Sequence, residues 1–378
     1  MQQLPLDPIT LTEALIAFDT SNPPGQERSC ALYLADILRT GGLEVTLDEF
    51  AAGRANVIAY LRGIESDNPL VLTGHLDTVP AGASPWATNP IGAVRRDGKI
   101  FGRGASDMKS GVAAIIAAAL EVAANHTTRH GLAVILTAGE EVGCAGAMSL
   151  VTRGLHPSRA SALLVAEPTS NQPAIAHKGA LYMNARTRGV TAHSSMPELG
   201  SNAIYKAARA IGKIEGYAFS EKHDLLGTPT INVGMVSGGM NVNSVPDSAA
   251  FTMDVRSVPG QTHRDVLKQL REYLGSEVDI EPFVDMPSVA TDPAHAFVRL
   301  ALKVTAEIEG MPTEPRALPF FTDASVLQPA LRCPTVILGP GEPSMAHQTD
   351  EFCYEDKIRR AADAFVQIAC SWDRRTGE

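Results

Sequence analysis

Residues 71–80 read Val-Leu-Thr-Gly-His-Leu-Asp-Thr-Val-Pro, an apolar segment that runs directly into a histidine and an aspartate. A short apolar run that ends at turn residues is typical of a buried strand. His75 follows this strand and can bind a metal ion, while Asp77 can hydrogen-bond the imidazole and fix its tautomer. A histidine that donates to a loop carbonyl is the more common arrangement, so this segment alone leaves both alternatives open.

Similar apolar runs follow along the chain and predict the fold class. Residues 132–137 and 162–166 are short, apolar and end at turn residues, and an alanine-rich segment at about 110–124 has the composition of a helix. Helical spacing is also present at 9–18 and 28–40. This α/β alternation predicts a mixed, mostly parallel sheet buried between helices.

After Pro173 the pattern changes to alternating polar and apolar residues, which predicts a second, smaller domain. Its βαββαβ-like order is typical of an α+β, ferredoxin-like arrangement. From about residue 288 the buried pattern returns, so we expect residues 176–287 to be inserted into a larger domain formed by 1–175 and 288–378. The expected strands are 180–187, 230–236, 248–255 and 335–338, and the expected helices are 203–214, 263–274, 294–308 and 355–372.

Composition narrows the classes of function. The chain has 378 residues and a formal net charge of -10, which argues against binding nucleic acid or an anionic membrane, because both require a basic surface. Its 5 cysteines include no Cys-x-x-Cys pair, and the N-terminal residues lack the basic and apolar regions of a signal peptide. We therefore expect a cytoplasmic protein that acts on a small molecule.

Asp107 lies in a glycine-rich segment, residues 102–110, that superficially resembles a nucleotide-binding loop. A phosphate-binding loop requires glycine directly before Lys-Ser, where this chain has Met108, and a dinucleotide-binding loop requires its third glycine where Asp107 stands. Both types of nucleotide site are thus disfavoured. Capping of the following helix is the common role for an aspartate in this place.

More acidic and imidazole groups occur where later strands are expected to end. Glu140 and Glu141 follow the strand at 132–137, and one of such a pair can bind metal while the other acts as a base, because their mutual repulsion raises one pKa. Open α/β sheets bind their ligands at this edge. The set that can bind paired zinc or similar ions comprises His75, Asp107, one or both of the adjacent glutamates, Glu167 and His347.

These motifs resemble the co-catalytic zinc amidohydrolases and exopeptidases, the family of acetylornithine deacetylase, succinyl-diaminopimelate desuccinylase, aminoacylase and glutamate carboxypeptidase. The resemblance covers nearly the whole chain, and the motifs occur in the same order as in the family. It is carried by GHLDTVP at 74–80, GRGASDMKSG at 102–111, Glu-Glu at 140–141, AEPTS at 166–170, GVTAHSS at 189–195, MDVRSVPG at 253–260 and LGPGEPSMAHQTDEF at 338–352.

The resemblance implies a role for each residue of the set. Two Zn²⁺ ions, for which Co²⁺ could substitute, would share Asp107 as a bridging ligand. Glu140 would be the general base, and Asp77 would orient His75. The inserted domain would be a lid that forms a homodimer, and its His193 would reach the active site of the partner subunit to hold the oxyanion. The remaining ligands would be His75 and Glu167 for one ion, and Glu141 and His347 for the other.

The resemblance also implies an acylated amino acid as substrate. The closest likeness is to acetylornithine deacetylases, which remove an acetyl group in arginine biosynthesis, because His177-Lys178 stands where many desuccinylases carry paired arginines. Other acetylated diamino acids, a desuccinylase, a glutamate carboxypeptidase and a binding protein without catalysis remain alternatives. The residues expected to contact substrate are Arg256, whose guanidinium group can bind both oxygens of a carboxylate, together with Asn243, Lys178 and Thr322.

Overall fold

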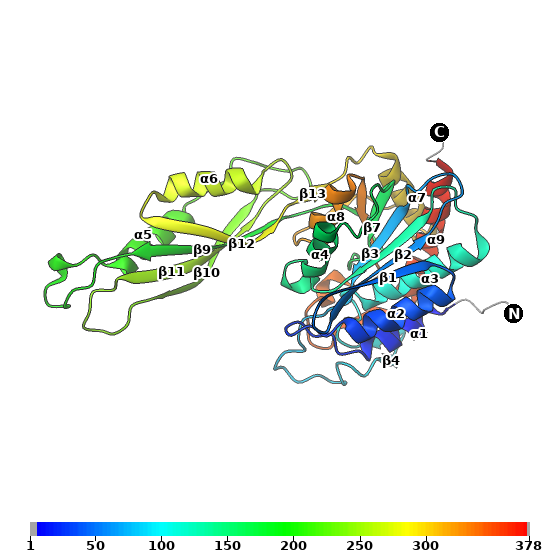
Figure 1. The fold of residues 1–378 in the computed structure, drawn as a ribbon, viewed down its shortest axis with the longest axis horizontal. Coiled ribbons are helices and arrows are strands. Elements are labelled where there is room, and N and C mark those ends of the chain that lie inside the picture. The colour runs from blue at the N-terminus through cyan, green and yellow to red at the C-terminus, as the bar shows by residue number, and fades with distance from the viewer. Residues whose placement is uncertain (1–5, 376–378) are drawn as a thin grey trace. The chain divides into compact units, whose positions relative to one another are not determined.

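The computed structural model of the protein describes residues 6–375, and within them the chain forms two compact units (Figure 1). The first unit comprises the chain up to Ala176, Ala290–Arg316 and the chain from Thr322 onward. The second comprises His177–Val289 together with Ala317–Phe321. The first five and last three residues, which we assigned to the larger domain, lie outside the described part.

The first unit is built on a mixed sheet whose centre is parallel. β3 (Leu70–His75) pairs in parallel with β6 (Leu132–Thr137) on one side and with β7 (Ala162–Val165) on the other. Every residue of these three strands is buried, which explains their continuous apolar sequences. The full order is β1 (Glu44–Ala51), β2 (Arg54–Leu61), β6, β3, β7, β15 (Thr335–Ile337), β8 (Ala174–His177) and β13 (Val289–Ala290), with β14 (Arg316–Leu318) paired to β8.

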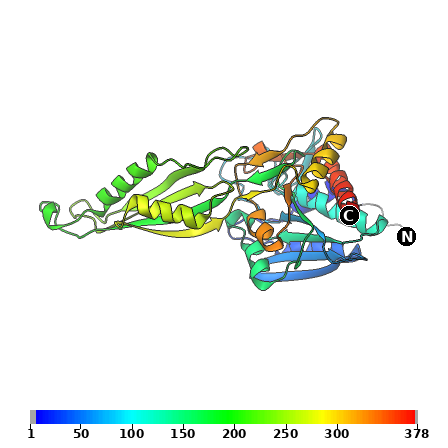
Figure 2. The same cartoon turned by 90° about the horizontal axis from the view of Figure 1, so that it is seen from above.

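Helices cover the sheet of the first unit and enclose its core. α3 (Lys109–Asn125) packs against α9 (Glu355–Arg375) and α1 (Pro8–Ile16), and these helices share one apolar cluster with the sheet, with α2 (Arg28–Thr40) and with α7 (Ala296–Glu309). α4 (Ala145–Arg153) instead packs against α8 (Ala324–Leu331), and Figures 1 and 2 show these two helices across the sheet from α2 and α3.

Gly111 allows α3 to approach the end of β7 closely. A Cβ atom at this position would lie 2.2 Å from the main-chain oxygen of Ala166, the residue before Glu167. A larger residue would therefore displace either the helix or the strand end. The glycine brings the N-terminus of α3, next to Asp107, close to the segment that carries Glu167.

A small antiparallel sheet joins two segments that are far apart in the sequence. β5 (Lys99–Phe101) pairs with β4 (Val94–Arg96) and with β16 (Phe352–Tyr354). The residues after β5 lead to Asp107, and those before β16 include His347 and a short 3-10 helix, η3 (Pro343–Met345). The pairing therefore brings the segments that carry these two side chains together.

The second unit is an antiparallel sheet with two helices on one face. The strand order is β10 (Thr230–Gly238), β11 (Ser248–Arg256), β9 (Ala180–Arg188) and β12 (Val278–Met286). Its core includes Phe251 and Met253 of β11 and apolar residues of α5 (Ala203–Glu215) and α6 (His263–Leu274). A short 3-10 helix, η2 (Pro197–Leu199), precedes α5. The order strand, helix, strand, strand, helix, strand matches the one expected from the sequence.

Two further features concern the length of the helices and the state of the cysteines. No helix between residues 6 and 375 combines the length and the apolar character needed to cross a bilayer. The five cysteines are free thiols, and all except Cys370 are buried.

Candidate metal centre

Neighbouring strands of the first unit end at one edge of the sheet and place polar side chains there. His75 is the last residue of β3, and Glu167 lies two residues beyond the end of β7. Glu140 and Glu141 begin a 3-10 helix, η1 (Glu140–Val142), shortly after β6. Because β6, β3 and β7 are adjacent and parallel, their carboxyl ends bring these side chains to one place.

Asp107 and His347 complete the group from outside the large sheet. The His75 Nε2 atom lies 3.1 Å from Asp107 Oδ1 and 3.8 Å from Glu167 Oε1. The His347 Nε2 atom lies 3.4 Å from Asp107 Oδ2 and 3.1 Å from Glu141 Oε2. Asp107 thus turns one carboxylate oxygen toward each imidazole, and the structure brings together all five side chains that the sequence singled out as ligands.

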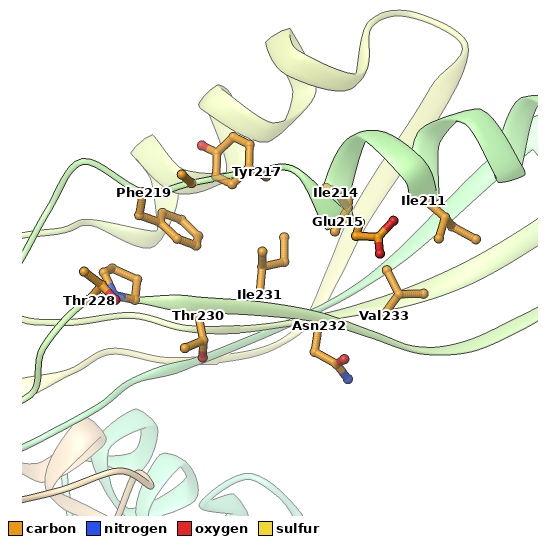
Figure 3. A pocket seen from close by; sticks show the side chains of 12 residues that line it. Ile211, Ile214, Glu215, Tyr217, Phe219, Thr228, Thr230, Ile231, Asn232 and Val233 are labelled. Carbon is orange, nitrogen blue, oxygen red and sulfur yellow. The ribbon is translucent and has the colours of Figure 1, made fainter.

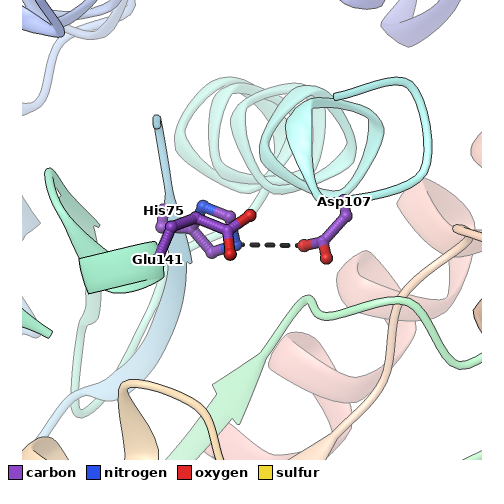
Figure 4. A group of neighbouring side chains, drawn as sticks. All are labelled: His75, Asp107 and Glu141. Carbon is purple, nitrogen blue, oxygen red and sulfur yellow. Dashed lines mark hydrogen bonds and ion pairs between the residues drawn. The ribbon is translucent and has the colours of Figure 1, made fainter. Parts of the chain in front are cut away.

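Figure 4 shows three side chains of this group whose ligand atoms lie close together. Ligand atoms of His75, Asp107 and Glu141 all lie within 4.8 Å of one another. Imidazole nitrogen and carboxylate oxygen are the donors that zinc and similar divalent ions accept. The donor set therefore fits a metal centre, in which Asp107 stands between the two histidines.

The charges of the group also fit bound cations. Glu140 and Glu167 are buried, and Asp107 and Glu141 beside them expose only 12% and 8% of their side chains. Within residues 6–375 none of the four forms an ion pair with lysine or arginine. Burial raises the pKa of Glu140 well above its usual range, and the charge of Glu167 raises it further. Divalent cations would remove this repulsion and keep the carboxylates ionised.

The two histidines lie where a compensating positive charge is stabilised. Hydrogen bonds to Asp107 and Glu141 raise the pKa of His347 to about 10. Burial would lower the pKa of His75, but the hydrogen bond to Asp107 and the charge of Glu167 outweigh it and raise that pKa well above its usual value. Both imidazoles therefore occupy positions where positive charge is favoured.

Asp77 holds the site together in a way that differs in part from our expectation. The His75 Nδ1 atom is 2.9 Å from the main-chain oxygen of Asp77 and 3.6 Å from the nearer carboxylate oxygen, so the closer contact to the imidazole is with the carbonyl. Nδ1 donates to this carbonyl, so Nε2 is the nitrogen that could bind a cation once it has lost its proton. The carboxylate of Asp77 instead accepts the main-chain N–H groups of Gly139, Glu140 and Glu141, at 2.8, 3.1 and 3.2 Å.

Two other buried carboxylates had no predicted role. Asp323 accepts a hydrogen bond from the hydroxyl of Thr137, and its Oδ1 atom has no partner in the described residues. Glu351 is fully buried and accepts main-chain N–H groups near Asp107. Both residues lie within or beside segments that the resemblance singled out. The presence of an acidic residue in a sequence does not show, however, that its side chain is buried against distant backbone.

The residues expected to contact substrate are engaged differently from one another. In the first unit, Thr322 is buried and its hydroxyl accepts the N–H of Ala324 at the start of α8. In the second unit, Arg256 Nε lies 2.9 Å from Asp254 Oδ1, and Arg256 Nη2 donates to the Tyr182 hydroxyl at 2.7 Å. This pairing leaves the guanidinium half-buried and oriented by neighbours of its own unit.

The other predicted residues of the second unit are more exposed. Lys178 donates to the main-chain oxygen of Thr228 at 2.8 Å. His193 and Asn243 are exposed, and the His193 Nδ1 atom is 2.8 Å from the Ser195 hydroxyl. The main-chain N–H of Ser194 donates to the oxygen of Asn243, so these two segments lie side by side.

Comparisons with known proteins place this geometry in a family. Residues 71–371 match the peptidase family M20/M25/M40. The chain is 32% identical over 374 residues to an acetylornithine deacetylase of Myxococcus xanthus, with 94% of this chain and 95% of the relative covered. It is 30% identical over 401 residues to a probable succinyl-diaminopimelate desuccinylase of Staphylococcus epidermidis, with 96% of each covered.

A solved structure agrees in fold. The structure of a dinuclear metal-binding peptidase of the M20 family from Bacillus subtilis aligns with a TM-score of 0.73 and 18% identity, covering 96% of each chain. The match of the family over most of the chain, together with the two relatives, confirms the resemblance seen in the sequence. The chain belongs to the peptidase family M20/M25/M40.

Proposed function

We propose that this protein is a metal-dependent amidohydrolase that removes the acetyl group of an N-acetylated diamino acid, with N2-acetylornithine as the first candidate. The observation that supports it most is Asp107, whose two oxygens face His75 and His347 among buried glutamates. We infer that Asp107 would hold two metal ions, together with His75 and Glu167 for one and Glu141 and His347 for the other. Zinc fits these donors, and cobalt is a plausible substitute.

Bound metal ions would lower the pKa of a water molecule and polarise the amide carbonyl. Glu140 is the residue we assign to proton transfer, because it is a carboxylate buried beside the ligands and is not needed as one of them. It would accept the proton of the attacking water and deliver it to the departing amine. Asp77 keeps the main chain of Glu140 in place during both steps.

A change of Glu140 to glutamine tests the assigned base. The amide keeps the size of the side chain but cannot accept the proton, so we expect kcat to fall by roughly 10²–10⁴-fold. Metal content, measured by elemental analysis of the purified protein, should stay that of the parent. A variant that retains kcat within about tenfold of the parent would contradict the role of Glu140 in general acid–base catalysis.

The substrate class rests on groups in the second unit and on the relatives. We assign Arg256 to the carboxylate of the substrate, because a guanidinium fork matches a planar carboxylate. Lys178 and Asn243 would make further polar contacts, Thr322 would contact substrate from the first unit, and His193 would hold the oxyanion in the partner subunit. Removal of a succinyl group is the second candidate, because a probable desuccinylase matches at about the same identity as the deacetylase.

A panel of substrates separates the two candidates. We expect kcat/KM on N2-acetylornithine to exceed kcat/KM on N-succinyl-diaminopimelate, because an acetyl group needs only a small apolar niche whereas a succinyl carboxylate needs a second cationic fork. Both assays should use the same enzyme preparation with added zinc or cobalt. A clear preference for the succinyl compound would reverse the assignment, and a preference for an acylated glutamate would favour a carboxypeptidase.

We further propose that the second unit forms a homodimer through β10, one of the two edge strands of its sheet. Met235 and Val236 on this strand are 68% and 66% exposed, which is unusual for apolar residues on an edge strand unless another chain covers it. A groove of about 750 Å³ lies beside it. Figure 3 shows its lining by apolar side chains of β10, of α5 and of the segment that follows α5, including Ile231, Val233, Ile214, Tyr217 and Phe219.

Sedimentation velocity tests the dimer. The parent should sediment as a dimer at micromolar concentration, and the double change Met235→Lys with Val236→Lys should give a monomer, because two buried charges would be placed at the contact. Ile64→Lys, which alters an exposed apolar residue of the first unit, is the matched control and should remain dimeric. A monomeric parent, or a dimeric double variant, would rule out this interface.

A further inference from the structure

The carboxylate of Glu351 is fully buried and binds the main chain that carries Asp107. Its Oε1 atom accepts the N–H groups of Ser106 and Asp107 at 2.7 and 2.9 Å. Its Oε2 atom accepts the N–H of Gly104 at 2.9 Å and the Arg103 Nη1 group at 2.6 Å. Each oxygen is thus saturated by two donors, all from the turn that presents Asp107.

Glu351 also belongs to the segment that carries His347, and further contacts join that segment to the Asp107 turn. The Ser106 hydroxyl donates to the main-chain oxygen of Phe352 at 2.7 Å and accepts the N–H of Glu342 at 2.9 Å. A Cβ atom at Gly341 would lie 2.1 Å from the main-chain oxygen of Ser106. The two segments are therefore in close contact on both sides of His347.

Arg103 extends this connection to the residue next to His347. Besides Glu351, its Nη1 group donates to the main-chain oxygen of Gln348 at 3.2 Å, and its Nη2 group donates to the oxygen of Pro80 at 3.3 Å. Its guanidinium also lies over the Trp86 ring, 5.2 Å from the centroid. The Arg103–Glu351 pair therefore fixes the backbone beside His347 and the backbone of Asp107 at the same time.

The two proposed groups of ligands differ in how much they need this support. His75 is the last residue of β3 and Glu167 follows β7, so the hydrogen bonds of the central sheet fix their positions. His347 instead lies in a loop with a left-handed main-chain conformation (φ 62°), and its side chain is half exposed. Nothing in the sheet holds His347 at its distance from Asp107.

We propose that Glu351 is a positioning residue that sets the distance between Asp107 and His347 and thereby the affinity for the ion these residues share with Glu141. This inference rests on the proposed set of ligands, and it assigns to Glu351 a role beyond that set. Groups that orient metal ligands typically change metal affinity by about 10–100-fold when they are removed. The loss should be larger for the second ion, because His75 and Glu167 of the first are held by the sheet, whereas His347 lies in the loop that Glu351 joins to the Asp107 turn.

Metal binding to Glu351→Gln tests this role directly. The glutamine amide would turn an NH₂ group toward two of the four donors, so the Asp107 turn would lose part of its attachment at unchanged side-chain size. Metal-free protein is titrated with Co²⁺ and followed by visible absorption, and with Zn²⁺ by calorimetry. We expect two bound equivalents for the parent. For the variant we expect one equivalent that weakens by less than about tenfold, because Asp107 serves it too, and one that binds about 10–100-fold more weakly.

Asp373→Asn is the matched control. Asp373 also accepts two main-chain N–H groups, those of Arg129 and His130 at 2.7 and 2.8 Å, but these residues lie outside the candidate metal centre. This control should lower the melting temperature of the metal-free protein yet bind both equivalents of Co²⁺ with the affinity and the spectrum of the parent. A general loss of stability is thereby separated from a change at the metal centre.

Arg103→Lys is the second variant, and it tests the positioning role of Glu351 if Glu351→Gln does not fold. It keeps a positive charge but loses the Nη1 group that contacts both Glu351 and Gln348, so it should also weaken the second equivalent more than the first. If the folded variants bind both equivalents like the parent, or lose both equally, the role of Glu351 is overturned. A parent protein that takes up no Co²⁺ or Zn²⁺ would instead overturn the proposed metal centre, a result that needs no variant.

Discussion

Repulsion among buried carboxylates is the constraint on which this site depends. Asp107, Glu140, Glu141 and Glu167 come together at the end of the parallel sheet, where no lysine or arginine of residues 6–375 pairs with them. Like charges in a buried place are costly unless protons or cations neutralise them. In this structure two imidazoles face the carboxylates, and Asp107 divides its oxygens between them.

Hydrogen bonds from main-chain N–H groups to two other carboxylates hold this arrangement in place. Asp77 accepts three such groups from the turn of Glu140 and Glu141, and Glu351 accepts three from the turn of Asp107. A carboxylate that accepts several N–H groups fixes a turn more firmly than single contacts would, because charge-assisted hydrogen bonds are the strong ones. The site is therefore built from acidic groups of two kinds: those that face the centre and those that face the backbone behind it.

The sequence predicted the elements whose pattern is local. The continuous apolar runs of β3, β6 and β7 identified buried parallel strands, and the alanine-rich segment identified α3. β1 and β2 were not predicted, although they are consecutive strands that pair with each other and β2 continues the pairing to β6. The cluster of His75, Asp107 and Glu141 was predicted from the order of the motifs, and the catalytic roles of its members stay predictions. Glu351 and Asp323 were missed because their burial depends on backbone and side chains that are distant in sequence.

Anomalous scattering at the zinc edge, measured on crystals grown with zinc, tests the central claim most directly. The account predicts two peaks, one on each side of Asp107, the first contacted by His75 and Glu167 and the second by Glu141 and His347. An absence of zinc at this edge of the sheet under saturating zinc, or ions bound without Asp107 between them, would contradict it.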